Sequence, residues 1–172
     1  VALDPERDSK LWAGWRHNPE FIRMLDSDPA KLFSAKANKE WMEKHLDDFL
    51  EYEFAIEDLE TGQIIGSTGL EGNMLIHGDA FVGIGIGESD HWGKGFGSDA
   101  MRVLLRYGFL ELGLHRVSLN VFSYNERAIR SYQKVGFVVE GISKNAILRE
   151  GKRWDMIWMG ILLDEWKSLN DY

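Results

Sequence analysis

A glycine-rich turn is the feature of this chain best suited to bind a ligand. Its residues run Trp92-Gly93-Lys94-Gly95-Phe96-Gly97-Ser98, after an alternating apolar stretch and before the longest helical pattern of the sequence. Glycines allow positive φ and let successive backbone N–H groups converge on one point. The helix that follows adds unpaired N–H donors and the positive end of its dipole. With Lys94 as a mobile positive charge, the turn indicates an anion cradle suited to a diphosphate rather than a plain flexible loop.

Two common phosphate-binding motifs do not account for this turn. A Walker loop requires Gly-x-x-x-x-Gly-Lys-Ser/Thr, and the chain has no such run. The dinucleotide fingerprint Gly-x-Gly-x-x-Ala fits the residues from Gly95 to Ala100, but it also needs an acidic residue about 20 positions later. Asn120, Val121 and Phe122 occupy that region. The dinucleotide interpretation therefore fails its second requirement.

A second segment, from Asn125 to Phe137, carries the signals of a short helix. Asn125 is typical of an N-cap, and Gly136 is typical of a helix stop. Tyr132 follows Asn125 by seven positions, which places it two helical turns along the same face. Taken alone, a tyrosine at this position is best explained as an amphipathic residue at the edge of a core.

Together, the two segments resemble the Gcn5-related N-acetyltransferase (GNAT) superfamily, in the branch similar to the ribosomal-protein-alanine acetyltransferases. The turn is similar to the family's Gln/Arg-x-x-Gly-x-Gly/Ala loop, with Trp92 in the place of Gln or Arg. The second segment matches Asn-x-x-Ala-x-x-x-Tyr-x-Lys-x-Gly-Phe almost residue for residue. The resemblance implies one GNAT domain over 1–172, of the α/β (α+β) class, with a mixed, mostly antiparallel twisted sheet split around acetyl-CoA and flanked by helices.

The resemblance also implies which residues form the site. Backbone amides of the turn bind the CoA pyrophosphate, and strand 82–86 splays from its neighbour so that pantetheine pairs with it. The Tyr132 hydroxyl protonates the departing thiolate, a tolerable leaving group because the pKa of a free thiol is ~8.5. The glycines at 83, 85 and 87 agree with such an opening and equally with a bulged edge strand. The implied cofactor-binding residues are Ile84, Gly85, Ile86, Trp92, Gly93, Lys94, Gly95, Phe96, Gly97, Ser98, Asn125, Ala128, Tyr132 and Lys134.

The general base is less clearly indicated. Some N-terminal acetyltransferases carry a glutamate where this chain has Asn120, and an amide cannot accept the proton. Glu71, at the end of the strand before the glycine-rich strand, is the available carboxylate, although a solvated turn residue explains it as well. Ordered water is the default base. His91 adjoins the turn, where it either favours an anion or is an exposed loop residue, and the histidines show no metal-ligand spacing, so no metal is expected.

The elements that would position these residues follow from periodicity and turn signals. The pattern predicts helices at 8–16, 20–25, 39–50 and 97–112 and one capped by Asn125, strands at 52–58, 63–70, 80–87 and 115–122, and a last hairpin of 137–148 and 154–163. Residues 74–78 are expected to form a hairpin connection, and residues 1–6 the tail of a truncated strand. Trp12, Trp15 and Trp41 fall in the helical part that walls the acceptor site in the family, and a core position is the alternative for each.

Composition excludes several classes of protein. The chain has 172 residues, a net charge of −8 and no cysteine, so it has neither disulfides nor a thiolate nucleophile. An acidic chain is unlike a nucleic-acid binder and mildly favours cationic partners. No apolar run approaches the ~20 residues that span a bilayer, so no membrane association is expected. A cytoplasmic location is expected, and a homodimer is left open.

Three functions from different classes remain open at this point. The first is transfer of the acetyl group of acetyl-CoA to a protein N-terminal amine by direct attack. The second is transfer to a small amine such as a polyamine, an amino sugar or an antibiotic. The third is a CoA-binding module without turnover.

Overall fold

The computed structural model describes residues 1–46, 51–72 and 74–170 of the chain. The helices are α1 (Pro5–Trp15), α2 (Pro19–Leu25), α3 (Ala35–Leu46), α4 (Met74–His77), η1 (Ser89–His91, 3-10), α5 (Phe96–Leu110), α6 (Glu126–Val135) and α7 (Leu163–Asn170). The strands are β1 (Glu51–Glu57), β2 (Ile64–Glu71), β3 (Asp79–Ile86), β4 (Arg116–Phe122), β5 (Val138–Arg149) and β6 (Lys152–Leu162). None of these helices is both long and apolar enough to cross a membrane.

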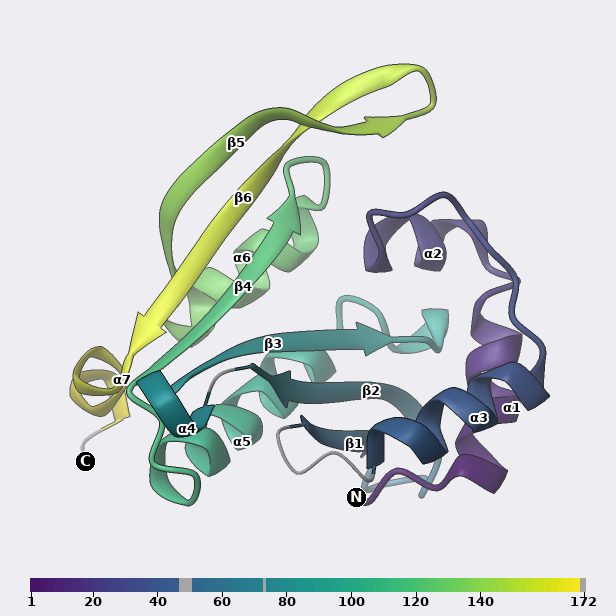
Figure 1. The fold of residues 1–172 in the computed structure, drawn as a ribbon, viewed down its shortest axis with the longest axis horizontal. Coiled ribbons are helices and arrows are strands. Elements are labelled where there is room, and N and C mark those ends of the chain that lie inside the picture. The colour runs from purple at the N-terminus through teal and green to yellow at the C-terminus, as the bar shows by residue number, and fades with distance from the viewer. Residues whose placement is uncertain (47–50, 73, 171–172) are drawn as a thin grey trace. The chain divides into compact units, whose positions relative to one another are not determined.

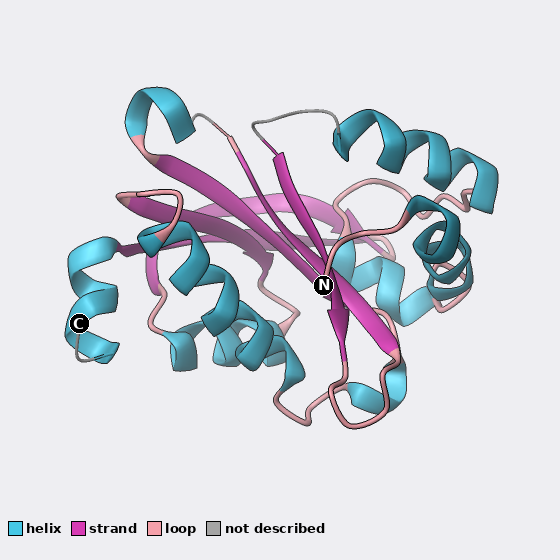
Figure 2. Cartoon of the chain, turned by 90° about the horizontal axis from the view of Figure 1, so that it is seen from below, coloured by secondary structure: helices cyan, strands magenta, loops and turns pink. Residues whose placement is uncertain are grey.

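The strands form one mixed sheet in the order β1-β2-β3-β4-β6-β5, labelled in Figure 1. β3 and β4 are parallel, whereas β4 with β6 and β5 with β6 are antiparallel. Figure 2 shows helices flanking the strands. The predicted fold class, a mixed and mostly antiparallel sheet flanked by helices, is confirmed.

The chain divides into two compact units, and β3 contributes to both. Unit 1 comprises Val1–Leu70 and Gly83–Gly97, and unit 2 comprises Glu71–Val82 and Ser98–Tyr172. The site residues expected from the sequence are therefore divided between the two units.

Unit 1 is built on the packing of α1 against α3 and of both against β1. Each of the first two helices begins with an N-cap and a proline in its first turn, since Asp4 and Asn18 accept backbone N–H bonds at the two starts. Of the strand tail predicted at 1–6, only Ala2 forms an antiparallel bridge, with Phe54, because the helix α1 already begins at Pro5. The buried cluster of the unit consists of Leu3, Trp15, Phe21, Met42, Ala55 and Ile64.

Unit 2 is built on the long β5–β6 hairpin, whose strand β6 also pairs with β4 (Figure 1). The apolar face predicted for α5 is buried at Met101, Leu104, Leu105 and Phe109. Phe109 contacts the Trp166 ring with centroids 5.3 Å apart, and Trp166 is almost fully buried. Trp166 is therefore a core residue of this unit.

Two helices were not predicted from the sequence. The predicted hairpin connection at 74–78 contains the one-turn helix α4, which ends at the left-handed Gly78. The sequence pattern also ended at Leu163, whereas α7 continues to Asn170 with Asp164 and Glu165 in its first turn. Elsewhere only boundaries moved: α3 begins at Ala35 rather than at Lys39, and the predicted helical stretch 47–50 lies outside the described residues.

Candidate functional site

The glycine-rich turn begins at an anchored tryptophan. The Trp92 indole N–H donates to the carbonyl oxygen of Ile86 at 2.6 Å, and the Trp92 backbone N–H donates to the carbonyl of Ser89 at 3.0 Å. Both N–H groups of Trp92 are thus engaged within unit 1. Trp92, included in the predicted cofactor-binding set, holds the turn to the end of β3 and has no N–H left for an anion.

The glycines that follow are required by backbone conformation and not by crowding. Gly93 has φ +73° and Gly95 has φ +97°, and a Cβ on either residue would meet nothing within 4 Å. Lys94 between them is exposed. The helix α5 starts at Phe96, so the N–H groups of its first turn have no carbonyl partner within the helix. The turn is therefore an exposed loop with unpaired donors at its end, as the sequence predicted.

Ser98 connects the start of α5 to α6 within unit 2. Its hydroxyl lies 2.7 Å from the hydroxyl of Ser131, and Ser98 is buried. Ser131 directly precedes Tyr132 in α6. The side chain of Ser98, one of the predicted cofactor residues, is thereby committed to the contact between these two helices.

The second predicted segment forms α6 with the expected cap. The Asn125 side-chain oxygen accepts the N–H of Ala128 at 3.2 Å, and Gly136 ends the helix in a left-handed conformation. Lys134 is exposed, on the polar side of the helix. The Tyr132 ring meets Phe137 edge to face with centroids 6.1 Å apart. Burial raises the pKa of Tyr132 to about 12, so its hydroxyl stays protonated at neutral pH.

Gly85 in β3 and Gly87 just after it pack against side chains of the first two helices, whereas a Cβ on Gly83 would meet nothing within 4 Å. A Cβ on Gly85 would lie 3.0 Å from Cδ1 of Leu25 and 3.4 Å from the Phe21 ring, and a Cβ on Gly87 would overlap the Trp15 ring. β3 continues to Ile86, past its last register position with β4, Phe81 opposite Ser118. The two expectations for these glycines, an opening or a bulged edge, both missed this close packing.

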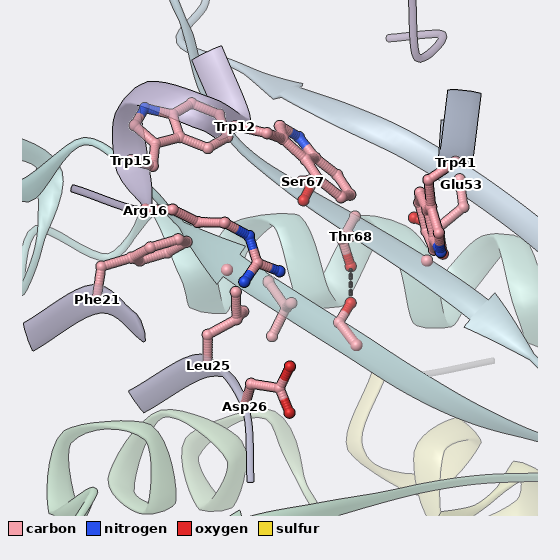
Figure 3. A pocket seen from close by; sticks show the side chains of 14 residues that line it. Trp12, Trp15, Arg16, Phe21, Leu25, Asp26, Trp41, Glu53, Ser67 and Thr68 are labelled. Atoms are coloured by element: carbon pink, nitrogen blue, oxygen red, sulfur yellow. Dashed lines mark hydrogen bonds between the residues drawn. The ribbon is translucent and has the colours of Figure 1, made fainter. Parts of the chain in front are cut away.

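A pocket of about 220 Å³ lies in unit 1, between these helices and the strands (Figure 3). Aromatic rings form much of it, and Trp12 lies 5.5 Å from Trp41 between ring centroids. All three tryptophans for which core and wall positions were weighed line it, and Trp15 is also buried in the core. The lining residues are Trp12, Trp15, Arg16, Phe21, Leu25, Asp26, Trp41, Glu53, Ser67, Thr68, Gly69, Gly83, Ile84 and Gly85.

Two carboxylates line this pocket, Asp26 and Glu53, and they are well separated in Figure 3. The Glu53 carboxylate occupies the place where a side chain on Gly69 would lie, so Gly69 makes room for it. One cation also lines the pocket, Arg16, whose guanidinium carbon lies 4.8 Å from the ring centre of Phe33. Neither carboxylate was predicted from the sequence. Glu71, the carboxylate that was predicted, is exposed at the end of β2 and belongs to unit 2.

His91 is not the exposed loop residue that the sequence favoured. It is largely buried, and its Nε2 lies 3.4 Å from Oδ2 of Asp58. The backbone N–H of Glu60, followed by the Thr61 side chain and His91, holds the pKa of Asp58 below its usual value. In the described part of the chain, no group of three or more histidine, aspartate or glutamate residues is arranged to hold a metal ion.

A family model described as an acetyltransferase (GNAT) domain matches residues 2–138. The chain belongs to this family. The superfamily expected from the two sequence segments is thus confirmed, on a match that includes the glycine-rich turn and the whole of α6.

The curated relatives of this GNAT chain include spermidine acetyltransferases and N-acetyltransferases whose names give no substrate. A spermidine N(1)-acetyltransferase of Vibrio cholerae is 33% identical over 133 residues, which are 77% of this chain and 76% of that protein. An N-acetyltransferase of Bacillus licheniformis, p20, is 32% identical over 113 residues. That alignment covers 66% of this chain and 63% of the relative, and alignments with two Bacillus subtilis N-acetyltransferases cover 57% and 42% of those proteins.

A solved structure similar to this GNAT chain is the spermidine N-acetyltransferase of Vibrio cholerae in complex with CoA and spermine. It is 28% identical, has a TM-score of 0.86, and the match covers 96% of this chain and 95% of that one. The likeness extends through both units and covers more of the chain than the family model does.

Proposed function

We propose that this chain is an N-acetyltransferase that moves the acetyl group of acetyl-CoA to a small amine with at least two amino groups, of the polyamine class. The observation that carries the proposal is the pocket of unit 1, in which aromatic rings lie together with the carboxylates of Asp26 and Glu53. Ammonium groups bind to carboxylates and to the faces of aromatic rings. The relatives named as spermidine acetyltransferases support the same substrate class.

Two amino groups matter because they must be in different protonation states. The attacking nitrogen has to be neutral. For an amine with a pKa near 10.4, only about one molecule in a thousand is neutral at pH 7.4. The other amino group remains charged, and a carboxylate of the pocket can hold it while the first reacts. A monoamine gains nothing from such a contact. Neither does a peptide N-terminus, whose single amine is already partly neutral because its pKa is near 8.

The cofactor would be held by backbone groups and by the second segment. We assign the pyrophosphate of acetyl-CoA to the N–H groups of residues 93–98, with Lys94 beside it, and the pantetheine to the edge of β3 at Ile84, Gly85 and Ile86. Asn125, Ala128 and Lys134 complete the proposed cofactor site along α6. The assignment of the turn is supported by its two left-handed glycines, Gly93 and Gly95, because the space around both is open.

The reaction proposed is direct transfer without a covalent enzyme intermediate. The amine nitrogen attacks the thioester carbonyl, a backbone N–H of β3 stabilises the oxyanion, and the C–S bond then breaks. The attacking nitrogen loses a proton to ordered water, with Glu71 as the candidate carboxylate. The pKa of Tyr132 is about 12, more than three units above the ~8.5 of a free thiol. Complete proton transfer from Tyr132 to the thiolate is therefore uphill, and we assign to Tyr132 a hydrogen bond that stabilises the departing sulfur.

An amine panel tests the substrate class. The purified chain is incubated with acetyl-CoA and either spermidine, butylamine, glucosamine or a peptide with a free N-terminal alanine, and release of free thiol is measured. We expect kcat/KM for spermidine to exceed that for butylamine by about 10–100-fold, the value of one charge-assisted contact. A preference for the peptide would support the N-terminal hypothesis instead, and no thiol release with any amine would leave only a binding module.

Replacement of Gly97 by alanine tests the cofactor assignment. A Cβ there would meet only Ile86 Cγ1 at 3.9 Å, and alanine favours a helix over glycine, so the fold should tolerate the change. If the diphosphate lies against this first turn of α5, the methyl group should raise the Kd of CoA about 10-fold or more by displacing a charged hydrogen bond. Calorimetric titration measures the Kd, and thermal unfolding checks the fold. A Kd equal to that of the wild type would place the diphosphate elsewhere.

A further inference from the structure

His91 stands at the base of the glycine-rich turn and contacts both of its ends. It is the last residue of η1, directly before Trp92, and its ring meets the ring of Phe96, the first residue of α5, with centroids 5.1 Å apart. The loop of residues 92–95 is thus closed at its base by two rings. Such closure matters because Gly93 and Gly95 impose no rigidity of their own.

Asp58 connects His91 to the turn between β1 and β2. Its side chain accepts the backbone N–H of Glu60 at 2.9 Å and its Oδ2 lies 3.4 Å from Nε2 of His91. Its backbone is also held, with its N–H donating to Gln63 at 2.9 Å and its carbonyl accepting from Gly62 at 2.8 Å. Asp58 is buried, so this carboxylate is a rigid point of attachment between β1 and β2.

The other ring nitrogen of His91, Nδ1, takes no part in the contact with Asp58. Nδ1 is buried and has no hydrogen-bond partner in the described part of the chain. A buried ring nitrogen without a partner is unfavourable, so its presence here calls for a compensating role. The contacts with Asp58 and Phe96 provide one.

We propose that Asp58 and His91 are positioning residues that hold the glycine-rich turn in the conformation needed to bind the cofactor diphosphate. The relevance to the cofactor rests on the function proposed above, whereas the restraint on the turn is a property of the free chain. Because the pair already restrains the flexible glycines in the free chain, the turn loses less conformational entropy when the cofactor binds. Neither residue is a ligand or a catalytic group.

Trypsin cleavage after Lys94 reports the restraint without any ligand. Lys94 is exposed between the two left-handed glycines, and a protease must straighten that segment before it cuts. His91→Ala should speed cleavage at Lys94 about 10-fold, since opening of the loop then no longer breaks the contacts with Asp58 and Phe96. His17→Ala, at an exposed histidine after α1, is the matched control and should cleave as the wild type does. An unchanged rate at Lys94 in His91→Ala would overturn the proposal.

A double-mutant cycle then tests whether the two residues act as one. Asp58→Asn keeps an oxygen for the Glu60 N–H, and His91→Phe keeps a ring beside Phe96. Each single variant is expected to raise the Kd of CoA about 3–10-fold and to keep kcat at saturating acetyl-CoA within about twofold of the wild type. If the two residues act as one, the Kd of the double variant should not exceed the higher of the two single-variant Kd values. Fully additive effects, or a fall in kcat with an unchanged Kd, would refute the pairing. If the wild type itself binds no CoA, the proposed function fails, and the Lys94 cleavage rates still decide the restraint.

Discussion

Replacement of Tyr132 by phenylalanine is expected to lower kcat about 10–100-fold and to leave the Kd of CoA within about threefold. The change removes one hydroxyl and keeps the ring that packs against Phe137. A hydrogen bond to a charged acceptor contributes about 1.5–3 kcal/mol, which corresponds to that range. Full proton transfer by a general acid would give a larger loss, about 100–10,000-fold. The size of the effect therefore distinguishes hydrogen bonding to the thiolate from complete protonation.

The pH profile gives a second test of the same assignment. Tyr132 must be protonated to donate, and its pKa is raised from 10.0 to about 12, so donation persists throughout the range in which proteins are assayed. The acceptor amine becomes more reactive as pH rises toward its own pKa near 10.4. We therefore expect kcat/KM for the amine to increase up to about pH 10 without an alkaline fall. A fall near pH 8–9 that disappears in Tyr132→Phe would contradict the raised pKa.

Tyr107→Phe is the matched control, because it deletes the same hydroxyl from the neighbouring helix in sequence, α5. Its kcat should stay within about twofold of the wild type, since surface or peripheral changes seldom exceed ±0.5 kcal/mol. Steady-state kinetics with spermidine and calorimetry with CoA provide both numbers for each variant. Equal kcat values for Tyr132→Phe and the wild type would remove Tyr132 from the reaction.

The parts of the site that sequence could predict are those encoded locally. The left-handed glycines at 93 and 95 and the cap formed by Asn125 depend on residues within a few positions of each other, and the structure has them where they were expected. Short-range signals of this kind can be read from the sequence because capping and turn conformation depend mainly on neighbouring residues and little on tertiary packing. The mixed, mostly antiparallel sheet was predicted from the family resemblance and not from these local signals.

The acceptor pocket depends on contacts between residues far apart in sequence, and it was missed for that reason. Glu53 sits in the segment Glu51–Glu57, where alternating acidic residues are typical of a strand with one solvated face. Its inward position becomes visible only once α1 and α3 cover that face and Gly69 is seen to leave room for the carboxylate. A glycine opposite a glutamate on the next strand carries no signal in a single sequence.

Replacement of Glu53 by glutamine should raise the KM for spermidine about 10–100-fold, the value of a lost charge-assisted contact in a partly enclosed site. Glutamine has nearly the same shape, so the space beside Gly69 stays filled and only the negative charge is removed. With Glu53 neutral, Asp26 and Arg16 remain as the charged residues of the pocket, and the formal charge of these three lining side chains changes from −1 to 0. The charged amino group of the acceptor then loses its partner, while kcat at saturation should change less than threefold.

A comparison of two acceptors separates this charge effect from a general loss of shape. Butylamine has no second amino group, so its KM should be nearly the same in Glu53→Gln and in the wild type, although both values will be high. Glu57→Gln makes the identical substitution four residues along β1, outside the pocket, and should leave both acceptors unaffected. An equal rise in KM for spermidine and butylamine would mean that Glu53 shapes the pocket and does not hold a distal ammonium. In that case the polyamine assignment loses its structural basis, since the second amino group of the acceptor would have no identified partner at Glu53.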